Sequence, residues 1–190
     1  HVRGRRHNLR DDLFDRHLLD DLNYLRLAAA GQRRDLRRPG AGGDDDDLGP
    51  DAGARSQGEA GARIVLIGDG DVAGVMATAM PETGVDIYMG TGGAPEGVLA
   101  AAALRCIGGN IQGRLLFRND DERGRAAKVG VEDLNRKYAI TDLASGDVIF
   151  AATGVTDGNM LQGVRRTAKY LSTESVAMRA RTGTVRWIRM

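Results

Sequence analysis

One segment joins an apolar run to an alanine-rich run through a loop dense in glycine, and it constrains the fold more tightly than any other part of the chain. Residues 85–89 are typical of a short strand, and residues 98–106 predict a helix whose first turn contains Pro95. The loop between them, residues 90–97, holds four glycines and the carboxylate of Glu96. Its first residues are Gly90, Thr91 and Gly92. Backbone N–H groups at a helix start favour an anion, and glycines let it approach closely, so the loop is a candidate phosphate site with Glu96 facing the ligand.

Strand-like and helix-like segments alternate along the chain from residue 62 onward. The other expected strands are 63–67, 111–117 and 147–151, and the other expected helices are 72–80 and 120–127. Near the end, residues 175–181 and 184–189 flank Thr182-Gly183 and predict a closing hairpin. This alternation indicates the α/β class, with layered and buried strands.

Two further polar glycine loops follow expected strands. One contains Asp69 and Asp71, and the other spans residues 152–158. If the strands run parallel, all three loops gather at their carboxyl ends and share one cleft, which suits metal-assisted phosphoryl transfer to water. Residues 59–190 contain no His and one Cys, so an oxygen ligand such as Glu96 indicates Mg²⁺ or Mn²⁺ rather than zinc. We expect Asp69 and Asp71 to accept hydrogen bonds from sugar hydroxyls or to touch the metal.

The residues leave other interpretations open. Residues 68–73 match the G-x-G-x-x-A pattern, so a nicotinamide dinucleotide-binding protein is an alternative, although two aspartates would repel a pyrophosphate. Each glycine loop alone is compatible with a tight turn. The threonines in these loops are equally compatible with residues that make hydrogen bonds at strand ends. A helix expected after residue 158 carries basic side chains that favour a solvated face over a phosphate site. These are Arg165, Arg166 and Lys169.

Residues 1–58 differ in composition from residues 59–190, and we expect two units. Residues 1–60 hold eleven Arg, eleven Asp and one Glu, with no Lys, Ile or Thr. A GC-rich gene translated in a wrong frame yields such a composition, so the segment is interpreted as a frame-shifted or disordered leader, with one helix between about residues 11 and 30. Its acids balance its arginines, which argues against nucleic acid as a partner. The Asp44–Asp47 run is expected to be a solvated charge run rather than a calcium loop.

The single cysteine, Cys106, cannot form an internal disulfide and is expected to be a small buried hydrophobe. A reducing, cytoplasmic setting fits it best. No stretch approaches the roughly 20 apolar residues of a membrane span, so no membrane partner is expected. The oligomeric state stays open, with a homo-oligomer as one alternative.

Four segments together resemble the class II fructose-1,6-bisphosphatases of bacteria in order and spacing. They are residues 67–72, 90–106, 152–158 and 178–186. The resemblance covers about residue 59 to the end and implies the sugar-phosphatase fold shared with inositol monophosphatases. It also implies hydrolysis of the 1-phosphate of fructose 1,6-bisphosphate to fructose 6-phosphate in gluconeogenesis, with Glu96 as a ligand of Mn²⁺, or of Mg²⁺ as the alternative metal. The residues that it implies as substrate contacts are Asp69, Gly70, Asp71 and Gly93.

Several features of the family are not found in this sequence: an Asp-Pro-Ile-Asp-Gly-Thr motif, a further Glu and Asp for the metals, and a basic Pro-Arg segment. One metal carboxylate of several remains, so we expect a C-terminal, substrate-side half with little or no activity as it stands. No residue is assigned as a catalytic acid or base. A non-catalytic phosphosugar-binding remnant and a truncated product without a stable fold are the alternatives. The preference between fructose and sedoheptulose bisphosphate stays open.

Overall fold

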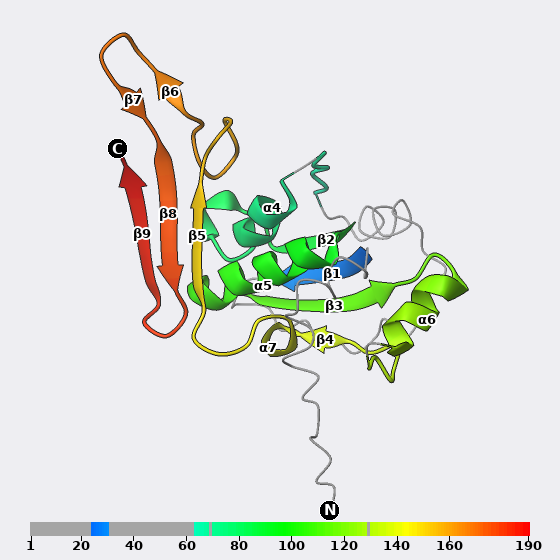
Figure 1. Ribbon diagram of the computed structural model, residues 1–190. Helices are drawn as coiled ribbons and strands as arrows, with labels where there is room; N and C mark the ends of the chain where they lie inside the picture. Colours follow the sequence, from blue (N-terminus) through cyan, green and yellow to red (C-terminus); the bar gives the residue numbers. More distant parts are fainter. Residues whose placement is uncertain (1–23, 31–62, 69, 129) are drawn as a thin grey trace, which may run out of the picture.

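The structure, a computed structural model, describes residues 24–30, 63–68, 70–128 and 130–190, with two sheets packed against a central helix and a third, two-stranded sheet that projects away from it (Figure 1). The helices are α4 (Asp71–Ala77), the short 3-10 helix η2 (Pro81–Thr83), α5 (Ala94–Ile107), α6 (Asp120–Lys128) and α7 (Ile140–Leu143). The strands are β1 (Tyr24–Ala30), β2 (Ile87–Gly92), β3 (Asn110–Leu116), β4 (Tyr138–Ala139), β5 (Ile149–Thr153), β6 (Arg165–Arg166), β7 (Leu171–Ser172), β8 (Glu174–Arg179) and β9 (Thr184–Arg189). This mixture confirms the α/β class. None of these helices combines the length and apolar character needed to cross a membrane.

The largest sheet has the strand order β2-β1-β3-β4. β1 pairs antiparallel with both β2 and β3, so these two strands point the same way and α5 connects them. The strand, glycine loop and helix predicted around residues 85–106 are confirmed by β2 and α5. However, every strand pairing among the described residues is antiparallel, which differs from the layer of parallel strands considered from the sequence.

Two predictions about the start of the fold are wrong. Residues 24–30 form β1 rather than part of a helix, and the other predictions for residues 1–58 concern residues outside the described part of the chain. Residues 63–67 have no regular secondary structure, and the side chains of Val65 and Leu66 are 69% and 85% exposed. Residues 63–67 do not form a strand in this sheet because β1 already occupies the position between β2 and β3.

α5 is the central helix, and it packs against both the four-stranded sheet and β5 (Figure 1). Small side chains allow this close approach on several faces. Its buried residues divide between two core clusters, Ala100, Ala101 and Leu104 in one and Ala103 and Cys106 in the other. The Cys106 sulfur lies 3.7 Å from the carbonyl oxygen of Val148, and burial raises the pKa of the thiol. The prediction of a buried, free cysteine is confirmed.

The second sheet has the order β5-β8-β9 and holds the predicted closing hairpin. Gly183, in the turn between β8 and β9, has φ +61°, a conformation that glycine adopts at low cost. A second hairpin, β6 and β7, projects past this sheet (Figure 1). The helix expected after residue 158 is therefore wrong. Thr167 turns the chain there, because its N–H donates to the carbonyl of Tyr170 at 2.9 Å.

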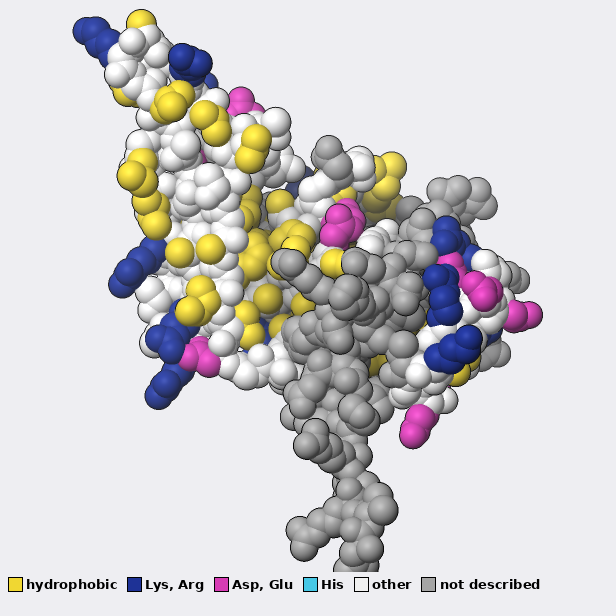
Figure 2. Space-filling view, in the orientation of Figure 1, with side chains coloured by type: hydrophobic (Ala, Val, Ile, Leu, Met, Phe, Trp, Pro, Cys, Tyr) yellow, Lys and Arg dark blue, Asp and Glu magenta, His cyan; other side chains and the backbone are white. Residues whose placement is uncertain are grey.

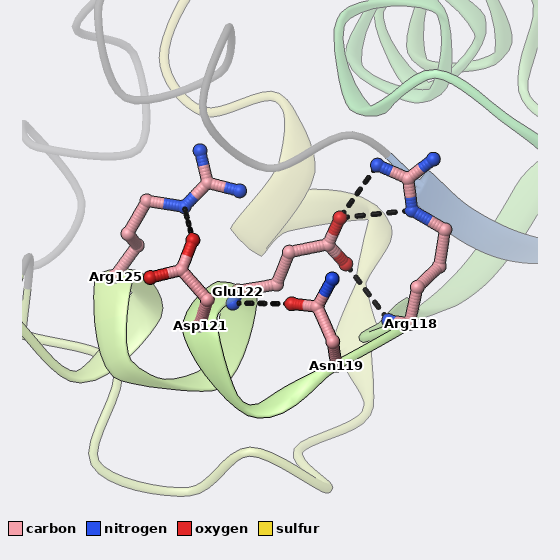
Figure 3. Close-up of polar contacts among 5 residues, drawn as sticks. All are labelled: Arg118, Asn119, Asp121, Glu122 and Arg125. Atoms are coloured by element: carbon pink, nitrogen blue, oxygen red, sulfur yellow. Dashed lines mark hydrogen bonds and ion pairs between the residues drawn. The ribbon is translucent and has the colours of Figure 1, made fainter.

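A buried carboxylate, that of Glu122, fixes the start of α6 (Figure 3). Its Oε2 accepts a hydrogen bond from the backbone N–H of Arg118 at 2.8 Å, and its Oε1 accepts two from the guanidinium of that residue at 2.6 and 2.8 Å. Oδ1 of Asn119 accepts a hydrogen bond from the N–H of Glu122 at 2.9 Å. Nε of Arg125 lies 3.7 Å from Oδ2 of Asp121, one turn earlier on the same helix. Because the buried charge is bonded in this way, we assign the cluster a structural role.

Candidate functional site

Two carboxylates from different helices converge on Gly92, the last residue of β2. A Cβ added to Gly92 would lie 2.8 Å from Oδ2 of Asp71 and 3.3 Å from Oε2 of Glu96. Asp71 is the first residue of α4, and Glu96 lies in the first turn of α5. A residue without a side chain is needed at this point, because any Cβ would displace Asp71. Gly92 is thus where the predicted aspartate and the predicted glutamate meet.

The backbone around each helix start sets the direction of these carboxylates. Gly93 is the extended residue before α5, and Oε2 of Glu96 accepts a hydrogen bond from its N–H at 3.1 Å. This half of a capping box holds the glutamate at the helix start, where the dipole of α5 favours negative charge. Gly70 precedes α4 with φ +77°, which a residue with a side chain rarely adopts. The turn at Gly70 therefore brings the first side chain of α4 toward β2.

Tyr88 supports Asp71 from the middle of β2. Its ring passes between two glycines: a Cβ on Gly74 would lie 3.2 Å from Cε2, and one on Gly90 would lie 2.5 Å from the hydroxyl oxygen. The hydroxyl lies near enough to the carboxylate of Asp71 for that carboxylate to raise the pKa of Tyr88 through its charge and as a hydrogen-bond acceptor. Burial, followed by the neighbouring carboxylates of Asp71 and Glu96, raises the pKa of Tyr88 from 10.0 to about 12. Tyr88 thus remains a proton donor at neutral pH and orients Asp71.

The pair of carboxylates offers oxygen donors on both sides of Gly92. Such donors suit Mg²⁺ or Mn²⁺, so the residues present fit one side of a site for either ion. Within the described part of the chain, no group of three or more His, Cys, Asp and Glu side chains is placed to hold a metal. A complete site would need ligands beyond Asp71 and Glu96, from water, from a bound phosphate or from other protein groups.

The structure brings together much of the predicted site. The residues that adjoin Gly92 directly or through a neighbour are Gly70, Asp71, Gly93 and Glu96. Asp69 lies outside the described residues. The expected loop is shorter than predicted, because β2 extends through Gly90 and Thr91 to Gly92 and these residues pair with β1. Thr91 is exposed, and the loop itself is reduced to Gly93.

The third predicted loop, residues 152–158, is built differently. Its strand, β5, belongs to the second sheet and pairs antiparallel with β8. The carboxylate of Asp157 accepts a hydrogen bond from the N–H of Gly163 at 2.9 Å, and the hydroxyls of Thr153 and Ser175 lie 2.8 Å apart. These polar groups are used within the loop or on the neighbouring strand. The contacts therefore support the interpretation of Thr153 as a residue that makes hydrogen bonds at a strand end rather than one that binds a ligand.

Tyr88 is the site residue that sequence reasoning missed. The signal was present, since side chains alternate along a strand and Tyr88, Gly90 and Gly92 share one face. A tyrosine two and four residues before glycines, on a strand that leads to an acidic loop, has room to lie over them. Strand periodicity alone places it near Gly92, whereas its bond to Asp71 depends on where α4 packs.

Comparisons with known proteins agree on one family. A family described as "Bacterial fructose-1,6-bisphosphatase, glpX-encoded" matches residues 54–190. The D-fructose 1,6-bisphosphatase class 2/sedoheptulose 1,7-bisphosphatase of Synechococcus sp. (strain JA-3-3Ab) is 39% identical over 143 residues, covering 68% of this chain and 41% of the relative. The fructose-1,6-bisphosphatase class 2 of Haemophilus influenzae is 40% identical over 142 residues, covering 67% of this chain and 42% of the relative. The chain thus spans about two-fifths of the length of these curated relatives.

Proposed function

The chain belongs to the family of bacterial, glpX-encoded fructose-1,6-bisphosphatases, and from that premise we propose that it carries the sugar-phosphate side of a metal-dependent phosphatase site. The reaction proposed for the complete site is removal of the 1-phosphate of fructose 1,6-bisphosphate, which leaves fructose 6-phosphate. Sedoheptulose 1,7-bisphosphate is the second candidate substrate, because the name of the Synechococcus relative includes it. We propose the sugar-phosphatase fold of inositol monophosphatases for the complete domain.

The observation that carries this proposal is the convergence of Asp71 and Glu96 on Gly92. Both carboxylates belong to segments that carry the family resemblance, and they come from different helices. The missing side chain of Gly92 lets the two acids come together at the strand end, where we propose that a hydroxylated, metal-bound ligand would meet both. The N–H of Gly93 donates to Oε2 of Glu96 at 3.1 Å, and Oε1 of Glu96 is the oxygen that we propose for the metal.

We assign the roles as follows. Glu96 would hold Mn²⁺, or Mg²⁺ in its place, and Asp71 with Asp69 would accept hydrogen bonds from sugar hydroxyls. The bound metal supplies charge that stabilises the phosphoryl group and acidifies the attacking water. Tyr88 keeps Asp71 in place and keeps its own proton at neutral pH. Gly93 would bring its backbone against the substrate, since it carries no side chain.

The chain as it stands is expected to bind the bisphosphate with little or no turnover, because a pair of carboxylates cannot hold a complete metal cluster. Phosphate release from fructose 1,6-bisphosphate with Mn²⁺ should equal that of a Glu96→Ala control. Binding is measured separately, by saturation-transfer NMR of the sugar bisphosphate in the presence of Mg²⁺, which avoids paramagnetic broadening.

Glu132→Gln is the matched control, because Glu132 is an exposed acid on another part of the chain. Glu96→Gln should weaken binding of the bisphosphate at least tenfold, and Glu132→Gln should change it less than twofold. Turnover above the Glu96→Ala control would show that the site is complete and would contradict the half-site assignment. Absence of binding by the unaltered chain would contradict the proposed function itself.

A non-catalytic phosphosugar-binding role is the second candidate, and one observation favours it: the described residues hold two converging acids rather than a cluster of three. The two candidates differ in one experiment. Supplying the rest of the family domain should restore Mn²⁺-dependent turnover if the chain is half of an enzyme. Binding that persists without turnover under those conditions would favour the second role.

We propose a cytoplasmic location, supported by the one free and buried cysteine. Fractionation of cells that express a tagged chain checks this, and recovery outside the cytoplasmic fraction would contradict it.

A further inference from the structure

The hydrophobic core ends abruptly in the middle of the second sheet. Val176 and Met178 of β8 are 0% and 2% exposed, and they pack in one cluster with Cys106 of α5. Their directly opposite partners on β9 are Trp187 and Val185, which are 52% and 39% exposed. Opposite residues of an antiparallel pair lie on the same face of a sheet. One sheet face is therefore buried at β8 and uncovered one strand further out.

The uncovered surface continues the core rather than standing apart from it. Figure 2 shows hydrophobic side chains on this sheet and in the hollow between it and the helices. α5 covers the face at β5 and β8, and no element among the described residues covers Trp187 to the same extent. Layered domains bury such a face against another element of the same domain. Ile188 lies on the other face of the same strand and is 42% exposed, but its partner on β8 is the half-buried, polar Ser175, whereas the partner of Trp187 is the fully buried Val176.

We propose that the Val185 and Trp187 face of β9 is the surface on which the rest of the family domain packs. The relatives supply the argument for this occupant, since well over half of each relative's length lies outside the matched part. A domain builds one continuous core, and this core is open where Trp187 lies. The remainder of the domain brings an apolar element that lies beside α5 and covers β9. The inference rests on family membership and not on the activity proposed above.

The experiment uses the full chain labelled with 5-fluorotryptophan, because Trp187 is its one tryptophan. The chain is co-expressed, and separately co-refolded, with the stretch of the H. influenzae relative that precedes its matched region. Fluorine NMR then reports on Trp187 alone. We expect a stable complex, a new fluorine signal, and at least a fivefold drop in broadening by a soluble gadolinium chelate. No substrate or metal is added, so failure here is distinguishable from failure of the proposed function.

Variants separate this face from the rest of the strand. Val185→Asp keeps the label and should weaken the complex at least tenfold, and Trp187→Ala should do the same. Ile188→Ala is the matched control and should change affinity less than twofold. Circular dichroism and urea unfolding of each variant alone show whether it folds as the unaltered chain does, and Val185→Thr serves if Val185→Asp does not fold.

Four results would overturn the inference. The first is no complex under either protocol, and the second is a complex in which Trp187 stays as accessible to gadolinium as before. The third is protection of Trp187 by self-association of the chain alone, which would make a second copy the occupant. Equal losses of affinity for Ile188→Ala and Trp187→Ala would likewise move the interface away from this face.

Discussion

The loops at Gly92 and at Gly154 have similar composition and opposite construction. At Gly92, two carboxylates from separate helices approach one glycine, and the position is open enough that Glu96 is exposed. At Gly154, two segments of backbone lie in close contact, because a Cβ there would lie 2.1 Å from the carbonyl oxygen of Gln162. Asp157 in that loop is bonded to the N–H of Gly163 and lies 3.5 Å from Arg165.

The difference shows what glycine does in each loop. Gly92 makes room for side-chain oxygens that can shift, whereas Gly154 makes room for backbone that cannot. Glycine and acid in a loop are therefore compatible with a binding site or with a self-contained turn, and the atoms that surround the glycine decide between them. A glycine-to-alanine substitution should therefore lower the free energy of unfolding in the loop at Gly154 and weaken ligand binding in the loop at Gly92.

The largest effect is expected for Gly154→Ala. The added methyl group overlaps the backbone of Gln162, so we expect a loss of about 3 kcal/mol in the free energy of unfolding. Urea unfolding followed by circular dichroism measures it. Gly158→Ala is the control, because its Cβ would lie 3.7 Å from the nearest atom, the carbonyl oxygen of Leu161, and should cost less than about 1 kcal/mol. Equal losses of unfolding free energy for Gly154→Ala and Gly158→Ala would show that close backbone contact at Gly154 does not matter for stability.

Gly92→Ala should have the opposite profile. Its methyl group would meet Oδ2 of Asp71 at 2.8 Å, and this side-chain oxygen can rotate away at a cost of about 1 kcal/mol or less. The displaced carboxylate should weaken binding of fructose 1,6-bisphosphate about tenfold, which corresponds to about 1.4 kcal/mol. Calorimetric titration and urea unfolding of the same sample give both values. Unchanged binding of fructose 1,6-bisphosphate together with a large loss of unfolding free energy would contradict the view that Gly92 is surrounded by side-chain oxygens that can move.

Tyr88→Phe tests the support beneath Asp71. Loss of the hydrogen bond to Asp71 should cost about 1 kcal/mol at pH 8. Folding raises the pKa of Tyr88 from 10.0 to about 12, so the folded chain holds this proton more tightly than the unfolded chain does. The stability that follows is complete below pH 10 and is lost as the pH rises toward 12.

Urea midpoints of the two proteins at pH 8, 9.5 and 11 check this. The unaltered chain should lose stability more steeply than Tyr88→Phe across that range. Parallel profiles for the two proteins would show that Tyr88 titrates alike in the folded and unfolded chains.

The smallest effect is expected for Asp157→Ala. It removes one bond to the N–H of Gly163 in an exposed loop, which should cost about 0.5 to 1 kcal/mol in the free energy of unfolding. Binding of fructose 1,6-bisphosphate should change less than twofold, because the acid belongs to the closed loop. A loss of binding similar to that of Gly92→Ala would place Asp157 in the site and remove the contrast between the loops.

The sequence predicts the part of this structure in which local signals agree. Pro95, Glu96 and the glycine before them mark the start of α5, and Thr182-Gly183 marks the turn between β8 and β9. The approach of Asp71 to Gly92 was expected only in outline, since it depends on the packing of α4 against β2. The polar glycine loops after the expected strands already single out Asp71 and Glu96, and the family resemblance implies a specific role for each.

What could not be predicted depends on partners that lie far away in the chain. The apolar residues 63–67 have the pattern of a strand, but strand formation also needs an edge to pair with, and β1 lies between β2 and β3. Residues 24–30 have helical spacing of leucines with their neighbours, yet they pair with two strands at once. The basic residues after position 158 form a hairpin because a turn at Thr167 returns the chain.

The most direct test of the central claim is a titration of the full chain with Mn²⁺ in the presence of fructose 1,6-bisphosphate, followed by electron paramagnetic resonance of the free ion. We predict that Glu96→Gln weakens Mn²⁺ binding at least tenfold, because Glu96 is the proposed metal ligand, and that Asp71→Asn weakens it less, through the lost contact with the sugar, while Asp157→Asn changes it less than twofold. Unchanged binding in Glu96→Gln, or an equal loss in Glu96→Gln and Asp157→Asn, would contradict the assignment of the metal and sugar-phosphate site to Gly92.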